Sequence, residues 1–286
     1  MKIIGFTCTY NEQEYIPYVM PYIKAFGYDR FIVYDNCSTD RTAELLENYP
    51  FVEVVKWDTD GKFDDEAKTE LQKKAFDMCK QMAEDGETIV MTFTDFDEVL
   101  YINSDVSNKR VIEEDYVWRE YNCFFKNMVN LFPPNTERSM DAIEDAVSRG
   151  MMVHTVNGVR ANFWVGGMKP TMIVVNDFKN IDFTTGNHYA FAEMEEGCKI
   201  KSYDDCCRMY GFHLKFIDKN ALKRKWRYYV EKGKEVYVEG INNFDTIYNG
   251  QIGVSFPLEN YFLQDGMMST LQSHSLIYNG LIERGK

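Results

Sequence analysis

The sequence lacks the signatures of several large classes of protein. Its seven cysteines include no CxxC pair, so neither a zinc site nor a disulfide framework is indicated, and a reducing, cytoplasmic setting is expected. No Gly-x-Gly-x-x-Gly follows the first apolar run and no Gly-x₄-Gly-Lys-Ser/Thr occurs, which removes the main support for a dinucleotide-binding or P-loop protein. The N-terminus lacks a signal-peptide layout, and no apolar run reaches the roughly 18 to 20 residues that cross a bilayer.

Positive charge is also scarce. The chain carries 32 lysines and arginines against 45 aspartates and glutamates, which gives a formal net charge of -13. Such a balance disfavours nucleic acid as a partner, because phosphate backbones are held by clustered cations. A phosphate-bearing ligand would therefore need a local positive group or a bound cation. The basic, aromatic run 223–229 leaves peripheral contact with a membrane surface open, although a solvated helix face is the simpler interpretation.

What the sequence does contain is a regular alternation of apolar patterns. Short, mostly apolar runs predict strands, and apolar residues at helical spacing predict helices between them. In chain order the expected elements are a strand at 2–9, a helix at 16–26, a strand at 31–34, a helix at 42–48, a strand at 51–57, a long helix through 67–82 and a strand at 88–94. This order predicts an α/β fold with a mostly parallel sheet covered by helices on both faces.

Beyond residue 102 the pattern is looser. A strand is expected at 116–125, one or two strands within 153–175, and a last strand at 211–216. A basic, aromatic helix is predicted at 220–232, and the tail is expected to be helical from 258 to 282.

Polar clusters follow three of the predicted strands, at 7–12, 35–40 and 95–98. The carboxyl ends of parallel strands lie along one edge of a sheet, where open α/β sheets bind their ligands. We therefore expect these clusters to converge. Each also has a simpler interpretation, since Asp is common in turns and Asn11, with Glu14 three residues on, is placed to cap the following helix.

The third cluster combines an apolar strand with three carboxylates, Asp95, Asp97 and Glu98. Mg²⁺ and Mn²⁺ take oxygen ligands, typically one or two carboxylates together with water and substrate phosphates. Asp95 and Asp97 are the candidate ligands, and Glu98 is expected to support them. A cation held there would let an acidic protein accept a phosphate ligand.

Taken together, these segments resemble the GT-A glycosyltransferases, in particular the family 2-like group. The resemblance is carried, over about residues 1–102, by Tyr10-Asn11-Glu12, Gly27-Tyr28-Asp29, the run from Tyr34 to Thr42, Gln72 and Asp95-Phe96-Asp97-Glu98. It implies a GT-A catalytic domain at 1–216 and a mainly helical extension at 217–286. The match is weaker past the first hundred residues, where it rests on Lys169, His188 and His213, and it ends near residue 235.

The resemblance also implies roles for individual residues. A UDP- or GDP-linked sugar donor would lie across the strand ends, and Mn²⁺ or Mg²⁺ would be the cofactor. Asp97 would be the direct metal ligand with His213 as a second ligand, and Asp95 would approach the ribose and the metal. The remaining implied donor contacts are Thr7 and Thr9 at the nucleoside, Asp35 at the base edge, Asn11 and Glu12 in the same pocket, Lys169 at the diphosphate, and His188 as the alternative histidine.

The implied reaction is attack by an acceptor hydroxyl on the anomeric carbon of the donor, with inversion. The acceptor would be a glycan or a lipid-linked molecule. A carboxylate would act as general base. The candidates for this base are Asp182, Glu193, Glu195 and Asp204.

Two other functions fit part of the sequence. A nucleotidyltransferase also sets carboxylates and a metal at strand ends, but it normally carries a glycine-rich, basic loop after the first strand, and 7–12 has neither feature. A catalytically silent nucleotide-sugar binding module stays open because no distinct general base is visible. Histidines and lysines are also more often ordinary polar groups than ligands. The alternative for His188, His213 and Lys169 is therefore a side chain that binds nothing.

Overall fold

The computed structural model describes residues 1–59, 64–102, 104, 106–125, 127–131, 151–153, 170–183, 190–203, 209–214, 218–245 and 256–257. Its first part has the predicted alternation of strands and helices. In order these are β1 (Lys2–Thr9), α1 (Ile16–Phe26), β2 (Arg30–Asp35), α2 (Thr42–Leu46), β3 (Val52–Lys56), α3 (Asp65–Ala83) and β4 (Ile89–Phe93). The four strands pair in parallel in the order β4-β1-β2-β3, which confirms the predicted α/β class.

Later segments extend this sheet and add two smaller ones. They are β5 (Glu98–Ile102), α4 (Asn108–Arg119), β6 (Cys123–Phe125), β7 (Asn127–Leu131), β8 (Met151–Val153), β9 (Pro170–Val174), the 3-10 turn η1 (Val175–Asp177), β10 (Phe178–Phe183), β11 (Ala190–Met194), β12 (Ser202–Tyr203), β13 (Met209–His213), α6 (Lys219–Glu231), α7 (Val236–Asn242) and β14 (Phe256–Pro257). The large sheet reads β12-β6-β9-β4-β1-β2-β3, with β9 antiparallel to both of its neighbours. The other two sheets are β10-β11 and β14-β8-β7-β13-β5.

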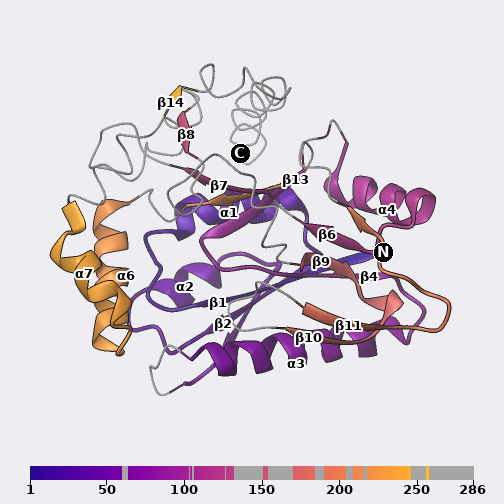
Figure 1. Cartoon of the computed structure of the whole chain (residues 1–286), viewed down its shortest axis with the longest axis horizontal. Coiled ribbons are helices and arrows are strands. Elements are labelled where there is room, and N and C mark those ends of the chain that lie inside the picture. Colours follow the sequence, from indigo (N-terminus) through magenta and orange to yellow (C-terminus); the bar gives the residue numbers. More distant parts are fainter. Residues whose placement is uncertain are drawn as a thin grey trace.

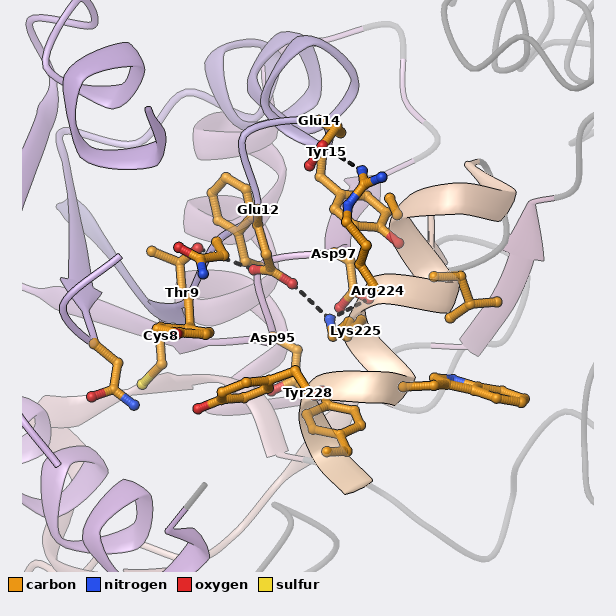
Figure 2. Close-up of a pocket in the computed structure, with 18 of the residues that line it drawn as sticks. Cys8, Thr9, Glu12, Glu14, Tyr15, Asp95, Asp97, Arg224, Lys225 and Tyr228 are labelled. Atoms are coloured by element: carbon orange, nitrogen blue, oxygen red, sulfur yellow. Dashed lines mark hydrogen bonds and ion pairs between the residues drawn. The ribbon is translucent and has the colours of Figure 1, made fainter. Parts of the chain in front are cut away.

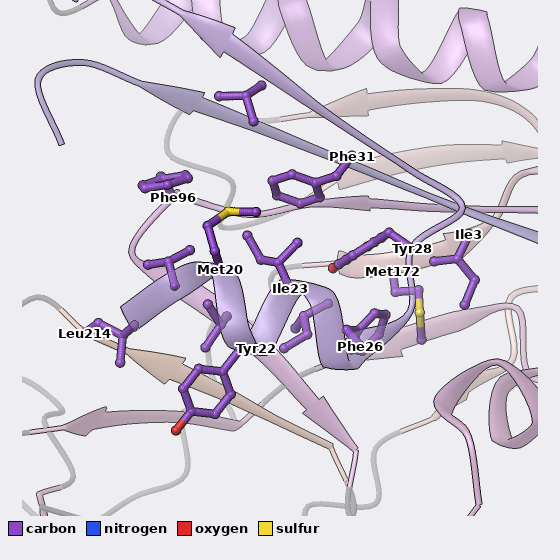
Figure 3. Close-up of a cluster of buried hydrophobic side chains, with 14 of the residues drawn as sticks. Ile3, Met20, Tyr22, Ile23, Phe26, Tyr28, Phe31, Phe96, Met172 and Leu214 are labelled. Carbon is purple, nitrogen blue, oxygen red and sulfur yellow. The ribbon is translucent and has the colours of Figure 1, made fainter. Parts of the chain in front are cut away.

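The large sheet lies between two layers, as Figure 1 shows. α3 and the β10–β11 hairpin cover one face, and α1 covers the other. On the α1 side, Met20, Ile23 and Phe26 pack under Phe31 of β2 (Figure 3). Fully burying an apolar side chain of this size stabilises the fold by about 1.5–3 kcal/mol. α1 ends at Gly27, whose φ of 87° is a left-handed conformation that glycine adopts without strain.

A second sheet brings a late segment next to the third strand-end cluster. β13 pairs antiparallel with β5, and His213 lies opposite Glu98 in that register. The amide N–H of Leu214 donates to the carbonyl oxygen of Asp97 at 2.8 Å, which fixes the end of β13 against the residue that precedes β5. The predicted last strand at 211–216 is therefore present as β13, which begins two residues earlier and ends three residues earlier than predicted.

Two local predictions were wrong. The expected strand at 116–125 is the end of α4 followed by the short β6. Two of the β-favouring side chains in this segment do not pack, since Val117 is 58% and Trp118 80% exposed. α4 instead buries Val111 and Ile112 and begins after Ser107, which caps it.

The second error concerns Asn11, which does not cap α1. The residue before α1 is Tyr15, and it makes no side-chain cap hydrogen bond. Asn11 itself has a φ of 52°, and its side chain serves the loop after β2 instead.

The predicted basic helix is α6, which extends from 219 to 231. Together with α7 it packs a small core of Leu222, Trp226 and Phe244. Ala221 joins the main core, so α6 also lies against the strand ends (Figure 1). The predicted helical tail at 258–282 lies outside the described residues. Within the described part of the chain, no helix has the length and apolar character to cross a membrane.

Candidate functional site

The end of β1 turns sharply and aims Glu12 inward. The amide N–H of Asn11 donates to Ser38 Oγ at 2.9 Å, and that of Glu12 donates to Thr42 Oγ1 at 2.9 Å. Asn11 Oδ1 accepts from the amide of Thr39 at 2.7 Å. The loops after β1 and β2 are thereby held together, and the positive φ of Asn11 is a conformation that Asn tolerates better than most residues. The buried hydrogen bond from the Glu12 amide to Thr42 positions the Glu12 carboxylate.

The loop after β2 uses its first carboxylate on itself. Asp35 Oδ2 accepts from the amide of Ser38 at 3.0 Å, and Oδ1 accepts from the Ser38 hydroxyl. Asp35 does not line the cavity described below, whereas the following residue, Asn36, does. Asn36 Oδ1 accepts from the amide of Thr59 at 3.1 Å and from its hydroxyl at 2.9 Å.

β4 delivers the two aspartates of the third cluster to different partners. Asp95 pairs with Lys68 of α3. Asp97 is buried, and its Oδ2 lies 3.6 Å from Nε2 of His213, which β13 brings alongside. The predicted pair of metal-binding residues, Asp97 and His213, is therefore together in the structure.

α6 adds a cation between two of the strand ends. Lys225 Nζ donates to Glu12 Oε1 at 2.6 Å and to Asp97 Oδ2 at 3.0 Å (Figure 2). The second oxygen of Glu12 accepts from Thr9 Oγ1 at 3.1 Å. Lys225 Nζ also lies 5.7 Å from the centre of the Tyr15 ring, within the range of a cation–π contact. One ammonium thus joins carboxylates from the ends of β1 and β4.

This arrangement separates the pKa values of the two carboxyl groups. Burial acts to raise the pKa of Asp97, but the nearby Lys225 and His213 outweigh it, and the pKa lies well below its usual range. For Glu12 burial outweighs the attraction of Lys225, so its pKa is raised. Burial acts to lower the pKa of Lys225, but Asp97 and Glu12 outweigh it and hold that pKa well above its usual value. Lys225 and Asp97 are therefore charged at neutral pH.

These groups line a cavity of about 930 Å³ between the strand ends and α6. Among its lining residues, carboxylates outnumber lysines and arginines. Tyr10 and Tyr228 stack across it with ring centres 4.4 Å apart, and Arg224 pairs with Glu14 (Figure 2). The volume lies within the usual range for sites that bind small molecules and cofactors, about 300–1,000 Å³.

The structure brings most of the predicted site residues to this cavity. The lining includes Thr9, Asn11, Glu12, Asp95, Asp97 and His213, together with Glu98. Thr7 is fully buried in β1 and, like Asp35, is not among the lining residues. Lys169 and His188 lie outside the described residues.

The candidate general bases are not brought to the cavity. Asp182, Glu193 and Glu195 belong to the β10–β11 hairpin and the residue after it, and none of them is among the lining residues. Glu193 pairs with Lys179 and Glu195 with Lys80. Asp204 lies outside the described residues.

Sequence reasoning missed Lys225. A solvated face is the simpler interpretation of the run 223–229, yet Lys225 lies on the same side of α6 as the buried Ala221 and Leu222. That signal was visible, because residues spaced four apart share one face of a helix. A lysine on an apolar helical stripe needs a buried anionic partner, and the predicted strand-end carboxylates were the available ones.

Comparison with known proteins completes the description. The model of a family described as glycosyltransferase family 92 matches residues 7–246. No curated protein matches the chain. Among solved structures, the crystal structure of 4-diphosphocytidyl-2C-methyl-D-erythritol synthase aligns over 84% of each chain with 9% sequence identity and a TM-score of 0.29, a likeness too low to support an inference.

Proposed function

The chain belongs to glycosyltransferase family 92, and from that premise we propose that it transfers a sugar from a UDP- or GDP-linked donor to an acceptor hydroxyl at the cavity between the strand ends and α6. The expected class, a glycosyltransferase, is confirmed, while the expected family was wrong, since the matching family is 92 and not the family 2-like group. The GT-A fold type, the identity of the nucleotide and inversion at the anomeric carbon are parts of this proposal.

One observation carries the donor site. Asp97 and His213, which lie far apart in the sequence, come within 3.6 Å at the carboxyl end of the parallel sheet and face a cavity of suitable size. Ligands of open α/β sheets bind at this edge. A carboxylate and an imidazole that line such a cavity suit a nucleoside diphosphate that enters with a divalent cation.

The donor set fits Mn²⁺ or Mg²⁺. Among the described residues no group of three histidine, cysteine or carboxylate side chains is placed to hold a metal. Two protein ligands are nevertheless sufficient, because these ions take their remaining ligands from water and substrate phosphates. When bound, the cation would neutralise the diphosphate leaving group.

The remaining task of the protein side chains is to orient the donor and to accept the proton of the acceptor hydroxyl. Asp97 and His213 would fix the diphosphate end of the donor, and Asn36, rather than Asp35, faces the cavity from the loop after β2. Acceptor attack from the open side of the cavity requires a carboxylate as general base. The three described candidates for that base lie on or beside the β10–β11 hairpin, so we propose that the base is another carboxylate that faces the cavity.

Thermal unfolding with Mn²⁺ and either UDP or GDP tests the donor site. A ligand at about one hundred times its Kd adds about 2.7 kcal/mol to stability, which corresponds to a rise in Tm of roughly 5–10 °C for a domain of this size. Asp97→Ala should remove the shift, and Asp97→Asn should remove it with less effect on packing. Lys225 keeps Glu12 as a partner in both variants, so we expect both to fold.

Glu53→Gln is the matched control, because Glu53 pairs with Arg30 at the surface and does not line the cavity. This variant should keep the full shift. If neither nucleotide raises the Tm of the wild-type protein with Mn²⁺ present, the donor assignment is wrong. If a nucleotide does raise the Tm, donor hydrolysis in the absence of acceptor separates a transferase from a silent binding module, since only the transferase releases free sugar.

A further inference from the structure

Lys225 occupies the position between the two most buried carboxylates of the site. The side chains of Glu12 and Asp97 are 7% and 4% exposed, and that of Lys225 is 22% exposed. Figure 2 shows both carboxylates pointing toward the Lys225 ammonium. Two buried carboxyl groups therefore share one positive charge that the chain itself supplies.

One oxygen of Asp97, Oδ2, contacts both Lys225 and His213. Asp97 Oδ2 accepts from Lys225 Nζ at 3.0 Å, and it is also the oxygen that faces His213 Nε2. A divalent cation held by this carboxylate and this imidazole would bind at about 2.1 Å from its ligand oxygen. The two positive charges would then be only a few ångströms apart in a buried setting, where their repulsion is weakly screened.

The geometry also provides an alternative place for the lysine. Lys225 Nζ lies nearer to Glu12 Oε1, at 2.6 Å, than to Asp97 Oδ2, at 3.0 Å. It can leave Asp97 without leaving the cavity, because Glu12 is held in place by Thr9 and by the backbone contact with Thr42. α6 keeps a separate ion pair between Arg224 and Glu14.

We propose that Lys225 is the resident cation of Asp97 in the metal-free protein, and that a divalent cation and Lys225 bind Asp97 in alternation. This inference rests on the proposed function in one respect, the assignment of Asp97 and His213 as metal ligands. Entry of the cation transfers Lys225 to Glu12 alone. Lys225 thus lowers the affinity of the empty site for free metal, so that the cation enters efficiently only with the diphosphate that adds its own ligands.

Binding of Mn²⁺ alone, measured by the electron paramagnetic resonance signal of the free ion, tests this inference. Lys225→Met removes the ammonium and keeps the length of the side chain, and it should bind Mn²⁺ at least about tenfold more tightly than the wild type. Lys225→Arg keeps the charge and should bind as weakly as the wild type. Adding Asp97→Asn to Lys225→Met should abolish the gain.

A second comparison covers the case in which Lys225→Met does not fold. Glu12→Gln with Lys225→Met removes one of the two carboxylates that the lysine contacts, and it should bind Mn²⁺ more tightly than Glu12→Gln alone. The inference is overturned if loss of the lysine leaves Mn²⁺ affinity unchanged or weakens it, which is what a purely structural role for Lys225 predicts.

The measurement contains no nucleotide, so its result is independent of the donor assignment. A wild-type protein that UDP and GDP fail to stabilise, combined with tighter Mn²⁺ binding by Lys225→Met, would refute the donor site and support the alternation. A nucleotide shift in the wild type without any gain in Lys225→Met would do the reverse.

Discussion

Replacing Lys225 by methionine should destabilise the protein more than any single change of its two partners. The substitution leaves Glu12 and Asp97 buried and close together without the ammonium that joins them, and only His213 remains beside Asp97. Removing one partner of a buried ion pair typically costs about 3–5 kcal/mol, because the remaining charge is desolvated and uncompensated. Asp97→Asn should cost less, since Lys225 then still pairs with Glu12 at 2.6 Å.

The cost of Lys225→Met should depend on pH in a defined direction. In the wild type the pKa of Asp97 is held below its usual value, so this group adds stability above pH ~4 that is lost as the pH falls through the lowered pKa. Without Lys225 only His213 still opposes burial, so the pKa of Asp97 should rise from its lowered value, in the direction in which burial already moves the pKa of Glu12. The variant then lacks much of the stability that Asp97 adds to the wild type above pH ~4. The difference in unfolding free energy should therefore be largest near neutral pH and shrink toward pH 4.

Urea unfolding at several pH values between 4 and 7, in the presence of a chelator, measures this difference. The matched control is Lys223→Met on the same helix, because Lys223 pairs with the exposed Asp245. An exposed pair contributes about 0–1 kcal/mol. A difference for Lys225→Met that is independent of pH, or no larger than that of the control, would refute the account of the buried triad. If the variant is unfolded at pH 7, its partial recovery toward pH 5 is the expected result.

Two further changes test how the fold positions the site. Gly5→Ala would place a Cβ 2.4 Å from Phe31 Cδ2 in the packed interior, so urea unfolding should show a loss of about 1–3 kcal/mol, and a loss below about 0.5 kcal/mol would contradict the packing described. Thr42→Val removes the hydroxyl that accepts from the amide of Glu12 at 2.9 Å and donates to Asp40 at 2.6 Å. It should cost about 1–3 kcal/mol, whereas Thr42→Ser should retain most of the stability, and equal stabilities for Val and Ser would show that these hydrogen bonds contribute nothing.

The architecture up to β4 could be predicted from the sequence because its signals are local. The spacing of Val19, Met20 and Ile23 describes one face of a helix, and Gly27 marks its end, without reference to distant parts of the chain. The same reasoning failed at 116–125, where Val117 and Trp118 favour a strand by composition but lie exposed on α4. There the helix is set by the Ser107 cap and by burial of Val111 and Ile112, a weaker pattern than the aromatic one.

Some features of the candidate site could likewise be predicted from the sequence, and others could not. Clusters at the ends of β1 and β4 were predictable, because parallel strands end at one edge of a sheet. The exclusion of Asp35 from the cavity was not, since only the folded loop shows that its oxygens accept from Ser38. Asn11 likewise carries a helix-capping pattern in the sequence and binds the neighbouring loop in the structure.

The sequence by itself thus determined the α/β class, the convergence of the strand ends and the acidic character of the site. Only the tertiary structure decided which cation meets those acids. Lys225 is separated by 213 residues from Glu12 and by 128 from Asp97. A helical pattern tells which face of α6 is buried, but it contains no information on what that face meets. That choice follows from the packing of α6 against the strand ends, where an ammonium was needed to balance two buried carboxylates.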